Sequence, residues 1–348
     1  MELADLGGWQ AVLGPLTAGR DLSAGQVTAA VTEILQGAAS PAQIAAFAVG
    51  LRMKGETIEE LAALLDVMRA FGERVELPTG SDAVDTCGTG GDRACTINAS
   101  TVAALVVAGA GAKVCKHGNR SQSSQCGSAD LLEALGVQIS LGPAEVAACV
   151  AQAGMGFCFA PRYHPAFRHV GPTRKELGVP TVFNFLGPVA NPAGVGRQVL
   201  GVSDPAMAAK LIGVLQAQGA ERALVVYGHD GLDELSTITT STVLELRDGD
   251  VRTYDVDPAA LGLTPATLDD IQGGDPARNA DLARRVLDGE PGPRREFVLL
   301  NAAAGLVAAG VADDLVAGLE AATASVDDGR AAATLDHLVR VSNEAAGP

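Results

Sequence analysis

Three glycines fall within four positions, at Gly88, Gly90 and Gly91, directly after a short run with the pattern of a strand, residues 83–85. Glycines let a backbone turn tightly and leave its N–H groups free to approach a ligand, which is how phosphate cradles are built. A Walker loop needs Lys-Ser/Thr after its last glycine, and a dinucleotide loop needs a final glycine that residues 88–93 lack. The cluster is either a phosphate site of another kind or only a tight turn between a strand and a helix.

Polar side chains follow the glycines in two groups. Asn98, Ser100 and Thr101 stand at the expected start of a helix, where free N–H groups gather at the positive end of the dipole. A second strand, expected over 111–115, delivers a set of polar residues onto one loop: Lys116, His117, Asn119, Arg120 and the serines at 123, 124 and 128. The carboxyl ends of adjacent parallel strands face one crevice, so both groups should contact one large anionic ligand.

Asp233 and Glu234 are the candidate metal ligands. They follow an expected strand over 223–227, and two adjacent carboxylates suit a hard cation such as Mg²⁺, which prefers oxygen ligands and substrate phosphates. The alternative is a solvated pair of charges on a surface loop.

The charge balance limits the class of partner. The 348 residues include 25 Lys and Arg against 41 Asp and Glu, a formal net charge of -16. Such acidity argues against nucleic acid or an anionic membrane as a partner. Between residues 113 and 175, however, seven Lys and Arg face three Asp and Glu, so positive charge is concentrated where an anionic substrate would bind.

The cysteines and the N-terminus indicate a reducing compartment. Six cysteines form no C-x-x-C pair, so the usual zinc and redox signatures are absent and small buried side chains are expected. The acidic N-terminus has no signal-peptide core, and no apolar run reaches the length of a membrane span. We therefore expect a cytoplasmic protein without a membrane partner.

The elements that must position these residues form two predicted domains. Residues 1–76 have apolar residues at helical spacing, a cap at Ser40-Pro41 and a capping box from Thr57 to Glu60, and they predict a small N-terminal helical domain. Residues 77–348 alternate short β-like runs with alanine-rich helices, which predicts a large α/β domain with a mainly parallel central sheet flanked by helices. Strands are expected over 83–85, 111–115, 137–140, 156–160, 198–202 and 223–227, with an antiparallel pair over 243–246 and 251–254. Helices are expected over about 99–110, 128–135, 143–153, 205–218, 276–288, 296–309, 311–323 and 329–341.

These blocks together resemble the anthranilate phosphoribosyltransferase family of the nucleoside phosphorylase and phosphoribosyltransferase superfamily. The likeness rests on DTCGTGGD at 85–92, KHGNR at 116–120, HPA at 164–166, RKELG at 174–178, NFLGP at 184–188 and GLDELS at 231–236, in the family's order. It implies transfer of the phosphoribosyl group of phosphoribosyl diphosphate (PRPP) to the amine of anthranilate. The products are N-(5-phosphoribosyl)anthranilate and pyrophosphate, in the second step of tryptophan biosynthesis from chorismate.

The resemblance also implies roles for the PRPP and metal residues. The leaving pyrophosphate needs electrostatic stabilisation more than the reaction needs a protein nucleophile. The residues implied for PRPP are Gly88, Thr89, Gly90, Gly91, Asp92, Thr96, Asn98, Ser100, Thr101, Lys116 and Ser128. Ser100, Asp233 and Glu234 would hold Mg²⁺, and Lys116, His117, Asp233 and Glu234 would form the catalytic group.

A second set of residues is implied for anthranilate. Arg174 would pair with the ortho carboxylate, which suits a guanidinium fork. The ring would lie among Gly88, His117, Asn119, Ala160 and Phe167. The aniline nitrogen is uncharged at neutral pH, so positioning is enough for catalysis, and His117 is either a general base or a packing and hydrogen-bonding group.

The family further implies that residues of about 172–187 pack back onto the helical domain and that a homodimer forms through that domain. Other readings remain: a substituted aminobenzoate as the acceptor, a pyrimidine nucleoside phosphorylase, or a non-catalytic relative that binds nucleic acid. A phosphorylase should carry a lysine-and-serine pair with glycines in place of residues 116–120. A nucleic-acid binder should have a basic face. This chain has neither feature.

Overall fold

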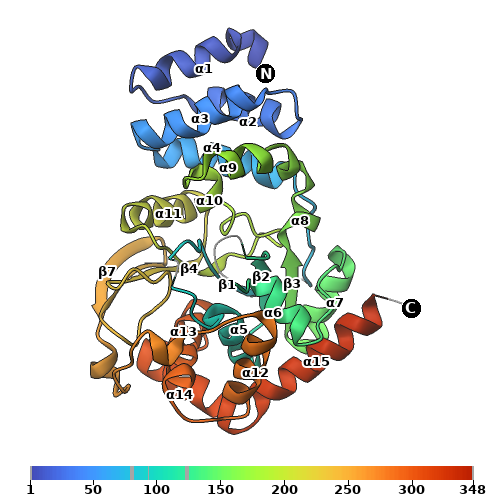
Figure 1. Ribbon diagram of the computed structural model, residues 1–348, viewed down its shortest axis with the longest axis vertical. Helices are drawn as coiled ribbons and strands as arrows, with labels where there is room; N and C mark the ends of the chain where they lie inside the picture. The colour runs from blue at the N-terminus through green and yellow to red at the C-terminus, as the bar shows by residue number, and fades with distance from the viewer. Residues whose placement is uncertain (1, 79–81, 93, 122–124, 347–348) are drawn as a thin grey trace.

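A layer of helices covers one end of an α/β body (Figure 1). The computed structural model describes residues 2–78, 82–92, 94–121 and 125–346. The helical layer consists of η1 (Leu3–Leu6), α1 (Gly8–Thr17), α2 (Ala24–Leu35), α3 (Pro41–Lys54) and α4 (Ile58–Ala70). Side chains fix the start of the last two helices: Ser40 accepts from the Gln43 N–H and Thr57 from the Glu60 N–H, each in a reciprocal capping box. The predicted Ser40 cap and Thr57 capping box are thereby confirmed.

The α/β body is built on one seven-stranded sheet in the order β3-β2-β1-β4-β5-β6-β7. Its strands are β1 (Val84–Gly88), β2 (Val114–Gly118), β3 (Met155–Phe159), β4 (Arg197–Gly201), β5 (Arg222–Gly228), β6 (Ser241–Arg247) and β7 (Asp250–Val256). Strands β1 to β5 are parallel, and β6 and β7 are antiparallel to their neighbours. The chain runs outward from β1 to β3, then returns to place β4 on the other side of β1. Ligands of open α/β sheets bind at such a switch point, beyond the carboxyl ends of the strands.

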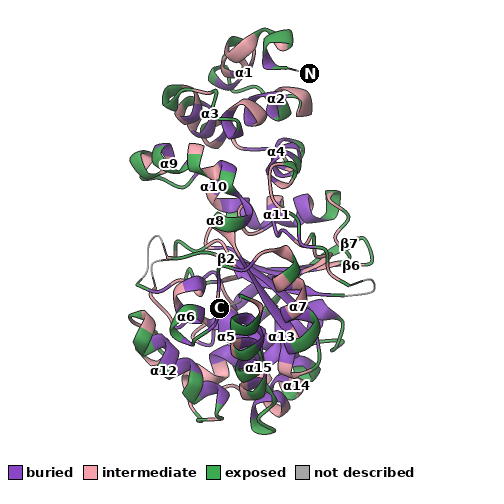
Figure 2. Cartoon of the chain, turned by 90° about the vertical axis from the view of Figure 1, so that its right-hand side faces the viewer, coloured by how far each residue is buried: buried purple, intermediate pink, exposed green. Residues whose placement is uncertain are grey.

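Two hydrophobic cores cover the two faces of this sheet. One core lies under α5 (Ala99–Gly109), α6 (Ser128–Ala134), α7 (Pro143–Ala153), α12 (Pro276–Leu287), α13 (Pro293–Ala309), α14 (Leu315–Asp327) and α15 (Arg330–Ala345). The other joins the helical layer to α11 (Pro205–Ala217) and to the opposite sheet face. Figure 2 shows the buried strands between the helices. The second core extends from the helical layer to the sheet without a break, so the position of the layer is coupled to the strands.

Short helices connect β3 to β4 beneath the helical layer. They are α8 (Ala160–Tyr163), η2 (Pro165–His169), α9 (Gly171–Leu177) and α10 (Val182–Phe185), and two further turns, η3 (Pro258–Leu261) and η4 (Asp269–Ile271), follow β7. Both α9 and α10 contact α3. Because α8 continues from β3 toward the helices (Figure 1), the carboxyl ends of the parallel strands face the helical layer.

Three predicted elements differ from the structure. Residues 137–140 are not a strand: the Gln138 N–H donates to Ser342 Oγ and the Ser140 N–H to Gln138 Oε1, so the segment has side-chain partners in place of a sheet ladder. Helix α14 begins at Leu315 rather than 311 because Asp314 caps it. Strand β2 begins at Val114 rather than 111, since Gly111 and Ala112 complete the end of α5. As a consequence, Lys116 and His117 lie within the strand and not on the loop that follows it.

The remaining predicted strands and helices are present at closely similar bounds. Five of the six cysteines are buried, as expected. Across the part of the chain that the structure describes, every helix is too short or too polar to cross a membrane.

Candidate active site

The glycine-rich loop lies at the switch point of the sheet. Gly88 ends β1, the Thr89 N–H donates to the carbonyl of Gly201 at the end of β4 at 2.8 Å, and the Gly90 N–H donates to Asp233 Oδ2 at 2.6 Å. A Cβ at Gly88 would overlap Asp233 Oδ2, and one at Gly201 would overlap the Asp233 carbonyl oxygen. Glycine is required at both positions because the loop that carries Asp233 approaches the two strand ends this closely.

Asp233 and Glu234 approach from the segment after β5. The Glu234 carboxylate accepts a hydrogen bond from the Ser100 N–H, in the first turn of α5, at 3.2 Å. Burial and the neighbouring Asp92 raise the pKa of Asp233 to about 7, and burial together with Asp233 and Asp92 raises the pKa of Glu234. Within the described ranges neither carboxylate has an ion pair. Buried acids that form no direct ion pair are the arrangement that a bound cation would relieve.

This donor set fits Mg²⁺ better than a softer metal. Its ligand atoms are carboxylate oxygens, which magnesium prefers, and magnesium is usually held by one or two carboxylates together with substrate phosphates. Among the described residues there is no ready-made group of three or more His, Cys, Asp and Glu that could hold a metal alone. The protein's two carboxylates would therefore need phosphate oxygens to complete the coordination.

Lys116 and His117 project from β2. Lys116 is buried, and its Nζ donates to the carbonyl of Thr86 on β1. Burial lowers its pKa, whereas Asp85, Cys87 and the pair Glu234 and Asp233 raise it. A nearly fully buried ammonium is thus balanced by carboxylates from two sides of the crevice.

His117 belongs to a row of rings that leads away from the sheet. Its ring lies 5.3 Å from that of His164, which lies 6.0 Å from Phe167, which lies 6.1 Å from Phe183. Burial, with smaller contributions from His164 and Lys116, lowers the pKa of His117 to about 3, so the ring is neutral at physiological pH. Its Nε2 is buried without a hydrogen-bond partner. A neutral ring with a free nitrogen can pack against or hydrogen-bond to an aromatic ligand.

Arg174 lies on α9, beneath the helical layer. Burial lowers the pKa of its guanidinium, and its Nε is buried without a hydrogen-bond partner. Within the described part of the chain it makes no ion pair. A desolvated and unpaired guanidinium has the chemistry to bind a carboxylate.

Other predicted residues have structural partners. Asn98 donates to the Cys126 carbonyl at 2.9 Å and accepts from Asn279 at 2.8 Å, so its amide is already engaged. Ser128 Oγ donates to the Asn119 carbonyl at 3.2 Å. Thr96 forms an isolated bridge with Gln272, whereas Thr101 Oγ1 is buried without a partner.

Three more predicted residues have simpler surroundings. Thr89 Oγ1 accepts from the Ser203 N–H at 3.3 Å, Ala160 begins α8, and Asp92 Oδ1 accepts from the Ala94 N–H. Gly91 has a φ of 90°, in the left-handed region that favours glycine. Ser123 and Ser124 lie outside the described residues.

Sequence reasoning assigned no role to a buried polar group between β1 and β2. Asp85 is fully buried and accepts from the His117 N–H at 3.1 Å and from Asn191 Nδ2 at 2.8 Å, while Gln198 lies beside it. The signal available was position: Asp85 is the one charged residue of a strand with an otherwise apolar or small-residue sequence, and Asn191 directly precedes a proline.

Comparison with known proteins gives the class first. The glycosyl transferase family, a/b domain, matches residues 80–332, and the glycosyl transferase family, helical bundle domain, matches residues 10–72. The described fold is thus that of a glycosyl transferase with a helical bundle domain and an a/b domain.

Individual relatives narrow that class. The anthranilate phosphoribosyltransferase of Rhodococcus jostii (strain RHA1) is 52% identical over 333 residues, covering 94% of this chain and 91% of that protein. The solved enzyme of Thermus thermophilus has 40% identity and a TM-score of 0.90, over 95% of this chain and 99% of that one. The Saccharomyces cerevisiae enzyme in complex with PRPP and Mg has 28% identity and a TM-score of 0.88, over 97% and 98%. The chain belongs to the anthranilate phosphoribosyltransferase family, a family of tryptophan biosynthesis.

The predicted family, fold class and transferase activity are thereby confirmed. The roles of individual residues and the division at residue 76 stay predictions.

Proposed function

We propose that this chain transfers the phosphoribosyl group of PRPP to the amine of anthranilate in a magnesium-dependent reaction, at the crevice between the strand ends and the helical layer. One observation carries the proposal: the glycine loop, the start of α5 and the Asp233-Glu234 pair meet through the Gly90–Asp233 and Ser100–Glu234 hydrogen bonds. Backbone donors and buried acids are thus in one place, which supports joint binding of a pyrophosphate and its cation.

At the PRPP end, the N–H groups of the glycine loop and of α5 would bind pyrophosphate oxygens, with Lys116 and Ser128 completing the set. Asp233 and Glu234 would hold Mg²⁺, together with Ser100. The ion would supply charge neutralisation for the leaving pyrophosphate. In this arrangement Asp233, which now accepts from the Gly90 N–H, would release that donor to the phosphate.

At the acceptor end, Arg174 would bind the anthranilate carboxylate, and His117, Asn119, Ala160 and Phe167 would enclose the ring. As the C1–O bond to pyrophosphate breaks, the amine nitrogen forms the new bond to C1 and then loses its proton to solvent water. We assign His117 the orienting role and not the role of a base, because its pKa of about 3 makes it a weak proton acceptor. His117→Asn should keep turnover within about tenfold from pH 6 to 9, and a larger loss that varies with pH would favour the base.

The test is the loss of anthranilate fluorescence on mixing the protein with PRPP and Mg²⁺, with EDTA as a control. We expect the loss to require metal and to disappear in Asp233→Asn/Glu234→Gln. The matched control is Asp248→Asn/Asp250→Asn, which removes two exposed carboxylates from the β6–β7 turn and should retain activity. Metal-dependent turnover that survives in the first double variant would contradict the metal assignment. If the folded wild type fails to turn anthranilate over, substituted aminobenzoates become the acceptors to screen.

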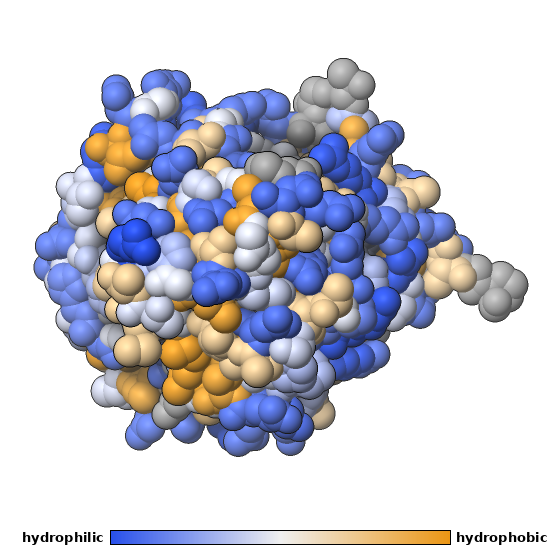
Figure 3. All heavy atoms as spheres, turned by 90° about the horizontal axis from the view of Figure 1, so that it is seen from above, coloured by the Kyte–Doolittle hydropathy of each residue, from blue (hydrophilic) through white to orange (hydrophobic). Residues whose placement is uncertain are grey.

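We also propose that two copies associate through the helical layer. Exposed apolar residues support this: Met53 is 84% exposed and Val179 is 55% exposed, and both line a shallow cavity of about 290 Å³ with Val49 and Pro180. Figure 3, which looks onto the helical end, shows hydrophobic residues gathered on this face. Light scattering should give a dimer mass for the wild type and a monomer mass for Met53→Glu/Val179→Glu. A dimer in both proteins would place the interface elsewhere.

A further inference from the structure

The sheet is split between its second and third strands, β2 and β1, beside the candidate active site. Strand β1 pairs with β4 along five residues and β2 pairs with β3 along five, but β1 and β2 are paired only at Val84 and Val114. Both strands are fully described, so the ladder between them ends after its first pair. The strands continue toward the crevice without backbone bonds to each other, although each backbone donor and acceptor in a buried region needs a partner.

Buried side chains supply those partners across the split. Asp85 on β1 accepts from the His117 N–H of β2 at 3.1 Å, and Lys116 Nζ on β2 donates to the Thr86 carbonyl of β1. Asn191 Nδ2 donates both to Asp85 Oδ2 and to the Cys115 carbonyl of β2, each at 2.8 Å. Side chains therefore replace the ladder bonds of three backbone groups.

Asp85 is the member of this group that acts on both active-site residues of β2. It binds the backbone of His117 directly, and its charge lies close enough to Lys116 to raise the pKa of that ammonium. It is itself held by Asn191, whose orientation is fixed because its Oδ1 accepts from the Ala193 N–H at 2.8 Å. Burial raises the pKa of Asp85 to about 6, whereas Lys116, Asn191 and the His117 N–H act to lower it, so its ionised form depends on partners from both sides of the split.

We propose that Asp85, oriented by Asn191, is a positioning residue for the transfer reaction: it bridges the split between β1 and β2 and fixes Lys116 and His117 relative to the glycine loop. The inference rests on the proposed function of those two residues. The glycine loop, proposed for PRPP, follows β1, whereas His117, proposed for anthranilate, lies on β2, so the width of the split sets the distance between the two substrates. A misplacement of about 1 Å can cost about 100-fold in rate.

A swap of the two interacting groups tests the bridge. In Asp85→Asn a donor faces the Asn191 donor, and in Asn191→Asp two carboxylates face each other. In the double variant the amide introduced at position 85 can donate to the carboxylate introduced at position 191, which can still accept from the Ala193 N–H. We expect each single variant to lose about 100-fold in kcat per PRPP-binding site, and the double variant to regain at least about tenfold, although its bond to the Cys115 carbonyl is lost.

The matched control is Gln198→Met. Gln198 is buried in the same group and donates to the Pro188 carbonyl at 2.9 Å and, at the longer distance of 3.5 Å, to Asp85 Oδ2, but it has no bond to Lys116 or His117. This variant should lose stability while kcat stays within about threefold of the wild type, a smaller effect than any displacement of reacting groups. Unfolding midpoints are measured in urea for every variant, so that rate and stability are compared directly.

Binding of PRPP with Mg²⁺, measured by calorimetry, counts the folded sites in each preparation. A kcat loss in Gln198→Met equal to that in Asp85→Asn at equal stability, or a double variant with no recovery, would overturn the positioning role. If Asp85→Asn does not fold, Asn191→Ala keeps the carboxylate and removes its orientation, and a kcat loss below about threefold would overturn the proposal. A wild type without transferase activity would instead overturn the proposed function, and this inference with it.

Discussion

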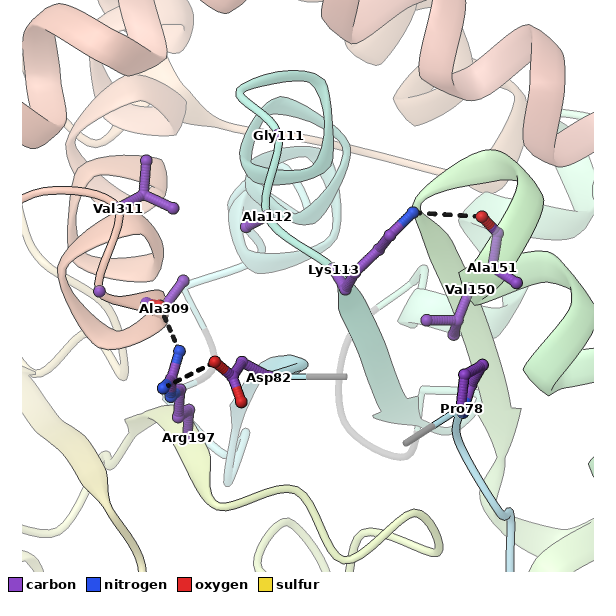
Figure 4. Close-up of a pocket in the computed structure, with 11 residues that line it drawn as sticks. Pro78, Asp82, Gly111, Ala112, Lys113, Val150, Ala151, Arg197, Ala309 and Val311 are labelled. Carbon is purple, nitrogen blue, oxygen red and sulfur yellow. Dashed lines mark hydrogen bonds and ion pairs between the residues drawn. The ribbon is translucent and has the colours of Figure 1, made fainter. Parts of the chain in front are cut away.

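The two ends of the parallel strands hold charged residues under opposite conditions. At their amino ends, a cavity of about 590 Å³ is lined by Asp82, Lys113 and Arg197 together with the carboxyl-terminal ends of α7 and α13 (Figure 4). At their carboxyl ends lie Asp233, Glu234, Lys116, His117 and Arg174. Both regions are charged, yet only the second has the groups that we propose for the transfer reaction.

Every charged side chain of the amino-end cavity has a partner. Arg197 pairs with Asp82 at 3.1 Å and Glu221 at 3.2 Å and donates to the Ala309 carbonyl at 2.7 Å, while Lys113 donates to the Ala151 carbonyl at 3.2 Å. These cations bind carbonyl groups at helix ends, where the helix dipole favours positive charge. Their arrangement is complete without a ligand.

At the carboxyl ends of the strands, by contrast, several buried polar groups have no partner. His117 Nε2, Thr101 Oγ1 and Arg174 Nε are buried without partners, and burial raises the pKa values of Asp233 and Glu234. Buried polar groups normally have partners, so these three exceptions, among nine such atoms in the described residues, are candidates for contact with a ligand. In this fold, buried polar groups without hydrogen-bond partners distinguish the candidate active site from the structural cavity better than cavity volume does.

The largest expected effect comes from removing the unpaired acids. The pKa of Asp233 rises from 3.8 to about 7 on folding. This group therefore favours the folded state most below pH 3.8, and its contribution is lost as pH rises toward 7. Without metal or substrate, Asp233→Asn/Glu234→Gln should be more stable than the wild type at pH 8, by on the order of 4 kcal/mol at 1.36 kcal/mol per unit of pKa.

Urea unfolding between pH 4 and 8 measures this difference. The difference in free energy of unfolding between the variant and the wild type should narrow as the pH falls. Mg²⁺ with PRPP should make the wild type the more stable protein, because these ligands bind only when the two acids are intact. Asp248→Asn/Asp250→Asn, in an exposed turn, should show no such pH dependence. A first double variant that is less stable than the wild type at pH 8 would contradict the view that the crevice stores unfavourable charge.

The next effect concerns the free guanidinium. Arg174→Ala should raise KM for anthranilate by about 100-fold, since a lost charge-assisted bond is worth about 1.5–3 kcal/mol. KM for PRPP should change by less than about twofold, because the proposed PRPP contacts lie on other elements. Lys175→Ala, which removes the exposed neighbouring cation on α9, is the control and should change neither constant. Equal losses for both substrates would mean that Arg174 supports the fold rather than the acceptor.

Much of this comparison follows from the sequence. Gly88, Gly90 and Gly91 predicted a close approach after β1, and an acidic pair after β5 predicted partners at the same edge, because parallel strand ends meet there. Arg174 was predicted from the family block, and it lies on α9. These residues were predictable because their neighbours in the sequence determine the local path of the backbone.

The split between β1 and β2, by contrast, depends on residues that are far apart in the sequence. Asp85 and Asn191 are separated by 106 positions, and the bond between them exists only once the sheet is assembled. The start of β2 was wrong for a related reason: residues 111 and 112 look extended in sequence but complete the end of α5. The alternation of Val137 and Ile139 likewise arises from packing against the core, because the segment lies outside the sheet. The spacing of apolar residues predicts which side chains are buried, but it does not predict the hydrogen-bond partners of the backbone.

The smallest expected effect concerns Arg197, in the cavity at the amino ends of the parallel strands. Arg197→Met should lower the free energy of unfolding by about 1 kcal/mol, because its acidic partners Asp82 and Glu221 are 66% and 63% exposed and exposed pairs are weak. KM and kcat should not change, since the cavity has no unpaired group to offer a substrate. Arg340→Met, which breaks an exposed pair with Glu344 on α15, is the control and should cost less. A change in KM for PRPP in Arg197→Met but not in Arg340→Met would show that the amino-end cavity affects substrate binding, and it would contradict the view that this cavity is purely structural.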